Sequence, residues 1–369
     1  MSQPMETETL RQWLSSGRPV TVLDIRTQED RAQWSIPGSI HIDAYTELKA
    51  GRPGALADAA LPADVPVVTI CNMGRVSRTA AQVLQQRGFE AHFLEGGMKS
   101  WSLAWNMAEV PVKDKRTRII QIRRTGKGCL SYLVCSMQDA FVIDASLPAQ
   151  IYLDLAAHHG LQIRYVLDTH IHADHLSRSR SLANKAGAAL CLPPQGRVHF
   201  PFTPIAHGDT VTLGKATLRA IRSPGHTLES TSYIINGEAL FTGDTLFLSG
   251  VGRPDLHADS DTARERARLL YQTLNQLLAI GPDVLVLPGH ASEPIAFDAV
   301  PLCARLGDVA ERLHEWLSSE EGFVERILKR IPPTPPNYTH IVELNEAGVL
   351  PEGDPTDLEA GANRCAVSS

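Results

Sequence analysis

The sequence predicts an α/β protein made of two domains in tandem. Its 369 residues exceed what one ordinary hydrophobic core accommodates, so a single domain is not expected. Short apolar runs alternate with helical patterns through the first hundred residues, which is typical of a mostly parallel sheet covered by helices on both faces. A second strand-rich pattern starts near residue 117 and contains a dense group of histidines and aspartates. We therefore predict a parallel-sheet domain followed by a second α/β domain that holds a metal.

The elements of each domain follow from periodicity. In the first domain, strands are predicted over 20–25, 65–70 and 91–94, and a helix over 75–87 that Gly88 can close in the left-handed conformation. In the second domain we expect helices over 149–159 and 261–279. Strands are expected there over 119–122, 130–135, 141–143, 163–167, 218–221, 232–235, 240–242 and 284–287.

Shifts in composition suggest the domain boundaries. The first domain is predicted over residues 1–106, a linker over 107–116 and the second domain over 117–300. A C-terminal extension over 301–346 includes the proline-dense stretch 331–336, which fits neither a helix nor a central strand. Residues 347–369 are rich in Gly, Ala, Asp and Ser, so a flexible tail is expected there.

Composition also limits the partners. The net charge is −6 without a long basic run, so a nucleic-acid partner is not expected. No segment approaches the roughly 20 apolar residues of a membrane span, and the first residues lack a signal-peptide pattern. The six cysteines form no CxxC pair, which fits a reducing compartment. We therefore expect a cytoplasmic enzyme that acts on small molecules, and a homo-oligomer.

One cysteine occupies a position suited to nucleophilic chemistry. Cys71 directly follows a predicted strand and opens a loop that leads into a helix, where backbone N–H groups and the helix dipole stabilise an anion. Arg75 and Arg78 add positive charge, and both effects favour the thiolate. Gly74 permits the tight curl of the loop. A lone cysteine more often just ends a strand, but this context favours a reactive site.

This region, over about residues 8–105, resembles the rhodanese-like sulfurtransferases. The matching pieces are Leu23-Asp24-Ile25-Arg26, Ile36-Pro37-Gly38-Ser39-Ile40, the CxxGxxS loop from Cys71 to Ser77, and Leu94-Glu95-Gly96-Gly97. The resemblance implies that Cys71 carries a persulfide sulfur between a donor and an acceptor, in a loop that includes Arg75 and Ser77. A phosphatase on the same fold needs Arg six residues after the cysteine; Ser77 stands there, so that activity is disfavoured.

The strongest signal is the sequence Thr169-His-Ile-His-Ala-Asp-His175, which follows a predicted strand. Four potential ligands on one loop at a strand end can converge on a point, and imidazole and carboxylate suit zinc, iron or manganese. Three further candidates stand at similar junctions. The full set is His170, His172, Asp174, His175, His226, Asp244 and His290, and we interpret the other histidines as surface or capping residues.

In this order the motifs resemble the metallo-β-lactamase superfamily over about residues 117–300. The resemblance implies a four-layer αβ/βα sandwich with the metal at one edge of the two sheets. All seven positions of the fullest, two-metal pattern are filled. The ligands alone therefore allow a two-zinc hydrolase, glyoxalase II-like, in which a bridging hydroxide attacks a thioester.

Two stretches, 243–255 and 332–345, resemble the persulfide dioxygenase branch more than glyoxalase II. That resemblance implies a single Fe(II) held by His170, His226 and Asp244, the 2-His-1-carboxylate set of non-haem iron oxygenases. His172, Asp174, His175 and His290 would then orient the ligands and water. Arg253 would help to fix the loop and the thiol substrate, or would form a structural ion pair with Asp255.

The implied reaction is the oxidation of a low-molecular-weight persulfide, such as glutathione persulfide, by O₂ to sulfite and free thiol. A sulfurtransferase domain fits this chemistry, because sulfite plus a persulfide sulfur gives thiosulfate and the reverse supplies persulfide. Glutathione-using relatives often continue Pro-Gly-His with Asp-Tyr, whereas Ala291 and Ser292 follow here. Coenzyme A, cysteine or another persulfide therefore remain alternatives, as does a first domain that only senses persulfide or docks a partner.

Overall fold

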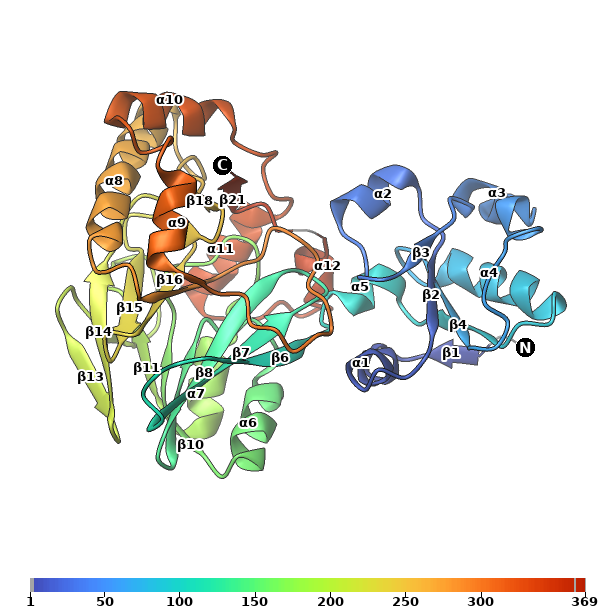
Figure 1. Cartoon of the computed structure of the whole chain (residues 1–369), viewed down its shortest axis with the longest axis horizontal. Coiled ribbons are helices and arrows are strands. Elements are labelled where there is room, and N and C mark those ends of the chain that lie inside the picture. Colours follow the sequence, from blue (N-terminus) through green and yellow to red (C-terminus); the bar gives the residue numbers. More distant parts are fainter. Residues whose placement is uncertain (1–2, 362, 369) are drawn as a thin grey trace.

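Two α/β units follow each other along the chain, and Figure 1 shows them side by side. The structure is a computed structural model that describes residues 3–361 and 363–368. The predicted α/β class and the order of the two domains are confirmed. Among the described helices, none combines the length and the apolar character that crossing a membrane requires.

The N-terminal domain is built on a five-stranded parallel sheet in the order β1-β5-β4-β2-β3. Helices cover both faces, as the alternation of strands and helices predicts: α3 and α4 pack on one core, and α1 and α5 on the other. The elements are β1 (Gln3–Met5), α1 (Thr7–Ser15), β2 (Thr21–Asp24), α2 (Gln28–Gln33), β3 (Ile40–His41), α3 (Tyr45–Lys49), a 3₁₀ turn (Gly54–Leu56), β4 (Val67–Ile70), α4 (Arg75–Gln86), β5 (Ala91–Leu94) and α5 (Gly97–Trp101).

The second domain contains two large mixed sheets. One has the strand order β12-β11-β10-β9-β8-β7-β6, and the other has the order β13-β14-β15-β16-β19-β20. The elements of the first sheet and its helices are β6 (Asn106–Val110), β7 (Thr117–Arg124), β8 (Cys129–Ser136), β9 (Asp139–Ile143), α6 (Ala149–His158), β10 (Gln162–Leu167), α7 (Ser179–Ala186), β11 (Ala189–Leu192) and β12 (Thr203–Pro204).

The second sheet and the elements that follow it complete the domain. They are β13 (Thr210–Leu213), β14 (Ala216–Arg222), β15 (Thr231–Ile235), β16 (Ala239–Gly243), β17 (Leu246–Phe247), β18 (Gly250–Gly252), α8 (Ser260–Leu278), β19 (Leu285–Pro288), β20 (Ala304–Arg305), α9 (Leu306–Leu313), α10 (Glu320–Lys329), α11 (Tyr338–Ala347), α12 (Thr356–Glu359) and β21 (Ala366–Ser368).

These elements form the predicted four-layer sandwich. Aromatic side chains such as Phe141 and Phe241 fill the core between the two sheets. On the outer face of the first sheet, Tyr152 of α6 and Leu182 of α7 are buried. Helices α8, α9 and α10 cover the outer face of the second sheet (Figure 1), where Phe323 is fully buried. The strand ends that carry the candidate ligands meet at one edge of this sandwich.

The predicted linker over 107–116 is wrong for its first half. Residues Asn106–Val110 form β6, which pairs antiparallel with β7 as the edge strand of the first sheet. Its side chains alternate between buried and exposed, the pattern of a strand with one face on a core. Residues 113–116 are all charged and lie in the segment 111–116, which forms no strand. The alternation of buried and exposed residues that marks β6 is only five residues long and comes just before them.

The flexible tail expected over 347–369 is also wrong. The segment contains α12 and β21, and β21 pairs antiparallel with β18. Glu359 is fully buried and forms ion pairs with Arg124 at 3.2 Å and Arg178 at 3.0 Å. The segment packs against the second domain although its composition, rich in Gly, Ala, Asp and Ser, is typical of a flexible tail. The proline-dense stretch 331–336 forms neither helix nor strand, as predicted.

Candidate metal centre

The His-rich loop leaves the carboxyl end of β10 and is held by hydrogen bonds to its backbone. Asp144, at the end of β9, accepts hydrogen bonds from the backbone N–H of Thr169 at 2.7 Å and from its hydroxyl. From α11, Asn345 donates to the carbonyls of His172 and His175 at 2.8 and 2.9 Å. The loop shape is therefore set by groups outside it, before any metal binds.

Three of the predicted ligands converge on one point. Oδ2 of Asp244 lies 3.9 Å from Nε2 of His170 and 3.9 Å from Nε2 of His226, and all three side chains are buried. None of these three atoms has a hydrogen-bond partner among the described residues. Leaving a buried polar atom unpaired costs about 1–3 kcal/mol, so three that face one another fit a site for a bound cation.

The Nδ1 atoms of His170 and His226 each make a hydrogen bond, so the Nε2 atoms face Asp244. Nδ1 of His226 lies 2.8 Å from the carbonyl of Arg253, and Nδ1 of His170 lies 2.9 Å from the hydroxyl of Thr169. Each contact favours a proton on Nδ1 and leaves Nε2 free to bind metal. Burial lowers the pKa of both His170 and His226, so both rings stay neutral, as metal ligands require.

A second cluster lies beside the first and contains Cys129, Asp174, His175 and His290. His290 stands between two carboxylates, with Nδ1 2.5 Å from Oδ1 of Asp244 and Nε2 2.9 Å from Oδ2 of Asp174. Nδ1 of His175 lies 3.1 Å from Oδ1 of Asp174. Burial disfavours a charged imidazole, but these carboxylates raise the pKa of His290 well above its usual value. Asp174 thus contacts both His175 and His290, while Nε2 of each of these rings has no hydrogen-bond partner among the described residues.

Cys129 was not identified from the sequence. Its thiol lies 3.6 Å from Asp174 and 3.8 Å from Nδ1 of His175. Burial by itself raises the pKa of this thiol, but His175 and His290 bring it down to about 6. Only the pairing of β8 with neighbouring strands brings Cys129 to this edge, and no motif in the sequence marks it.

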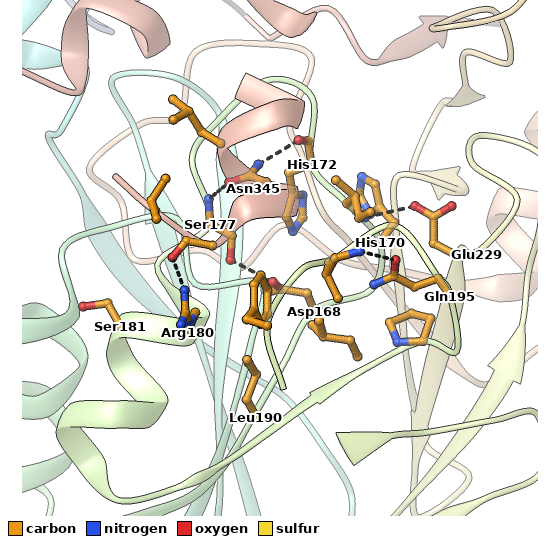
Figure 2. A pocket seen from close by; sticks show the side chains of 18 of the residues that line it. Asp168, His170, His172, Ser177, Arg180, Ser181, Leu190, Gln195, Glu229 and Asn345 are labelled. Atoms are coloured by element: carbon orange, nitrogen blue, oxygen red, sulfur yellow. Dashed lines mark hydrogen bonds between the residues drawn. The ribbon is translucent and has the colours of Figure 1, made fainter. Parts of the chain in front are cut away.

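His172 faces a third group, with Asp144 and Asp168. Its Nε2 lies 3.3 Å from Oδ1 of Asp144, and Asp168 accepts hydrogen bonds from the hydroxyls of Ser177 and Ser179. His170 and His172 are therefore neighbours in sequence that face different clusters. Figure 2 shows both rings with Asp168 in the wall of the same cavity.

Two cavities reach two of the three converging ligands, one at His170 and the other at His226. The cavity of Figure 2 encloses about 620 Å³, includes His170 in its wall and is lined by apolar side chains such as Leu192, Phe200 and Leu344. The other cavity encloses about 1220 Å³ and is lined by His226, Arg197 and Arg266. The three converging ligands are thus bordered by a cavity at His170 and by another at His226.

Arg253 is fully buried, and its guanidinium forms an ion pair and hydrogen bonds with other groups of the protein. It pairs with Asp255 at 2.8 Å, as one of the two sequence interpretations predicts, and donates to the carbonyls of Pro333 and Arg364. The side chain holds the loop that supports His226. A direct contact with substrate, the other interpretation, does not fit this burial.

The Cys71 loop has the tight curl that the sequence predicts. The thiol is 1% exposed, and Ser77 approaches its sulfur with both the backbone N–H and the hydroxyl at 3.4 Å. Gly74 has a φ of 78°, and a Cβ there would lie 2.8 Å from the backbone nitrogen of Gly96. Arg75 is exposed and makes no hydrogen bond or ion pair within the described part of the chain. The groups closest to the sulfur therefore come from Ser77.

A cavity of about 760 Å³ lies between the Cys71 loop and the C-terminal segment. The neighbours of the thiol, Asn72 and Met73, line one side, and Thr356 and Asp357 line the other. Lys99 crosses this space and forms ion pairs with Asp354 and Asp357. The N-terminal domain thus presents the edge of its cysteine loop to the second domain.

Comparison with known proteins agrees with this architecture. The family model for the rhodanese-like domain matches residues 6–104, and that for the metallo-beta-lactamase superfamily matches residues 124–290. A hydroxyacylglutathione hydrolase of Anaeromyxobacter dehalogenans is 34% identical over 200 residues, which are 52% of this chain and 75% of that protein. A beta-lactamase hydrolase-like protein of Agrobacterium fabrum is 29% identical over 56% of this chain. The chain spans about half (52%) of the length of that relative.

Solved structures give the same result for the fold. The crystal structure of ETHE1 from Myxococcus xanthus superposes with a TM-score of 0.55 at 26% identity, covering 62% of this chain and 97% of that one. A metallo-beta-lactamase from Staphylococcus aureus shares the fold, with a TM-score of 0.58 at 23% identity over 64% of this chain and 74% of that one. The chain belongs to the metallo-beta-lactamase superfamily and carries a rhodanese-like domain in front, so both family resemblances are confirmed.

Proposed function

We propose that the protein is a persulfide dioxygenase with an attached sulfurtransferase. It oxidises a low-molecular-weight thiol persulfide with O₂ to sulfite and free thiol at one Fe(II), held by His170, His226 and Asp244. The supporting observation is that Nε2 of His170, Nε2 of His226 and Oδ2 of Asp244 lie within 4.8 Å of one another and have no hydrogen-bond partner among the described residues. Two imidazoles and one carboxylate are the set that binds non-haem iron, and bound Fe(II) supplies a redox-active centre with open positions for sulfur and O₂.

The protein's own groups hold this set in place. The carbonyl of Arg253 and the hydroxyl of Thr169 fix the two rings, and His290 occupies Oδ1 of Asp244 so that Oδ2 is left for the metal. Such supporting contacts orient ligands and keep the site from rearranging. Apolar side chains such as Leu192 and Phe200 in the cavity beside His170 limit water around a bound sulfur chain, and Arg180 in the same wall suits an anionic group.

In this proposal the first domain transfers the outer sulfur of a persulfide or of thiosulfate through Cys71. As a thiolate, Cys71 attacks the outer sulfur of a persulfide or of thiosulfate, forms a Cys71 persulfide and releases the thiol or sulfite. Attack of sulfite on the outer sulfur of the Cys71 persulfide forms thiosulfate and restores the thiolate. The two donors of Ser77, each 3.4 Å from the sulfur, stabilise the anion in both directions.

A second candidate is a two-zinc thioester hydrolase. It is favoured by the burial of all seven predicted ligands in one region and by the relative named hydroxyacylglutathione hydrolase. It requires His172 to turn toward His170, and Asp174, His175 and His290 to exchange their mutual contacts for a metal ion. We rank it second because in this structure those residues face other clusters.

Oxygen consumption by the purified full chain tests the proposal. Samples prepared without metal are loaded with Fe(II) or with Zn(II), the bound metal is measured, and glutathione, cysteine and coenzyme A persulfides are added. We expect O₂ uptake with sulfite formation only in the iron sample, at about one iron per chain. The proposal is rejected if the iron-loaded sample consumes no O₂ with any persulfide while the zinc-loaded sample cleaves S-lactoylglutathione.

Two variants serve as controls. Asp244→Ala removes the carboxylate of the three converging ligands and should abolish both metal binding and O₂ uptake. Cys71→Ser leaves the metal centre intact, so O₂ uptake on an added persulfide should persist while sulfur transfer from thiosulfate is lost. Unchanged sulfur transfer by Cys71→Ser would leave the first domain with a sensing or docking role.

A further inference from the structure

The C-terminal segment Asn363–Val367 lies against the metal centre. Nδ2 of Asn363 donates a hydrogen bond to Oδ2 of Asp174 at 2.8 Å. The thiol of Cys365 lies within 4.8 Å of a carboxylate oxygen of both Asp174 and Asp244, and Cys365 is 0% exposed. The segment therefore occupies space beside both carboxylates that a second metal ion would need.

Several contacts fix the segment in this position. The backbone N–H of Cys365 donates to Oδ1 of Asn363 at 2.8 Å, which orients the amide of Asn363 toward Asp174. The carbonyl of Cys365 accepts from the backbone N–H of Arg253, and the guanidinium of Arg253 donates to the carbonyl of Arg364. Beyond Cys365, β21 pairs with β18, which directly precedes Arg253. The same loop thus supports both His226 and the segment.

A second metal ion would have to displace these contacts. Its candidate ligands are Asp174, His175 and His290, whose ligand atoms lie within 4.8 Å of one another. Oδ2 of Asp174 already accepts from Asn363 and lies 2.9 Å from Nε2 of His290. Buried hydrogen bonds are costly to break, because each broken one leaves an unpaired polar group behind.

We propose that Asn363 and Cys365 are positioning residues that close the second metal position and thereby make the centre mononuclear. Asn363 holds Asp174 in its contacts with His290 and His175, and Cys365 fills the space between the two carboxylates. The proposal rests on the one-metal centre of the proposed function, but it concerns how many ions bind and not which reaction they support.

Metal binding by the full chain tests this directly, without reference to activity. The metal-free protein is titrated with Zn(II) and with Co(II) by calorimetry, and elemental analysis counts the bound ions. We expect about one ion per chain for the unaltered protein and about two for Asn363→Ala/Cys365→Ala, because Asp174 is then free to bind metal. Cys135→Ala is the matched control: it removes a buried thiol outside the centre and should leave the count at one.

Two results would overturn the proposal. One is a wrong number of bound ions, which means about two in the unaltered protein or still one in the folded double variant. The other is a sulfur-to-cobalt charge-transfer band in the unaltered protein that disappears in Cys365→Ser, which would make Cys365 a ligand instead. Circular dichroism checks folding, and if the double variant does not fold, Asn363→Ala alone should still show a second, weaker binding event; its absence counts against the proposal.

The number of bound ions and the O₂ uptake are measured separately, so this proposal and the proposed function can fail independently. One bound ion that increases to two in the double variant supports the closing role even if the iron-loaded protein consumes no O₂. Conversely, O₂ uptake by a protein that binds two ions would support the dioxygenase and reject the closing role.

Discussion

Replacing Glu359 by Gln tests the most deeply buried charge cluster of the second domain. The Oε2 atom of Glu359 lies 3.2 Å from Arg124 and 3.0 Å from Arg178, and Oε1 accepts from the backbone N–H of Leu176 at 2.6 Å. All three charged side chains are buried. The substitution keeps the shape of the side chain but leaves two guanidinium groups without a counter-charge.

Two arguments give a similar magnitude. Breaking a buried ion pair by removing one partner costs about 3–5 kcal/mol. Burial alone would raise the pKa of Glu359, but Arg124 and Arg178 lower it from 4.5 to about 2. At 1.36 kcal/mol for each pKa unit, that difference corresponds to about 3 kcal/mol. For a domain of this size the loss should lower the melting temperature by roughly 6–20 °C.

The same carboxylate makes a prediction about pH. Because its folded pKa is lowered, its contribution to stability is present above pH 4.5 and is lost as the pH falls from 4.5 toward 2. Glu359→Gln should therefore melt lower than the unaltered protein at pH 7, and the gap should narrow in acid. Thermal unfolding followed by circular dichroism measures both. Glu352→Gln, which changes an exposed carboxylate, is the control, and equal melting temperatures for the two variants at pH 7 would refute the reasoning.

Three further variants test the two sites. His172→Ala should lower activity more than metal content, because His172 faces Asp144 and Asp168 and not the shared point; loss of half the metal would instead indicate a two-metal centre. Cys129→Ser removes a buried thiol with a pKa of about 6 next to His175, so the ultraviolet thiolate absorbance of the metal-free protein near pH 7 should decrease. Gly97→Ala places a Cβ 2.1 Å from the carbonyl of Cys71 at a φ of 59°, so sulfur transfer should fall sharply and the first domain should lose at least about 1 kcal/mol of stability. Gly88→Ala, at a φ of 92° with no atom nearby, should leave sulfur transfer unchanged.

The sequence predicts well whatever depends on local pattern. Strands with continuous apolar runs, such as β4 and β10, and amphipathic helices such as α4 and α8 lie within about two residues of their expected bounds. The seven candidate ligands stand at strand ends, and the carboxyl ends of adjacent strands meet at one edge. Their gathering in one buried region therefore follows from fold class and motif together.

What the sequence does not predict depends on contacts between distant segments. The division of His170 and His172 between two clusters is set by Asp144 and Asp168, which no periodicity places. Cys129 and Asn363 reach the metal centre only through the packing of β8 and of the C-terminal segment. Polar composition normally indicates a loose tail. Here the buried ion pairs of Glu359 and the pairing of β21 override that tendency.

The contact between the domains limits how sulfur could move between the two sites under the proposed function. The indole N–H of Trp34 donates to the carbonyl of Thr125 at 2.9 Å, and a Cβ at Gly126 would lie 1.8 Å from the carbonyl of Trp101. The carbonyl of Cys71 is itself held by the backbone N–H of Met98 at 2.9 Å. A buried thiol on a loop held in this way is poorly suited to swing between two centres. Under the proposed function we therefore expect a sulfur-carrying small molecule that enters the cavity beside Asn72 and Met73 to connect the two sites.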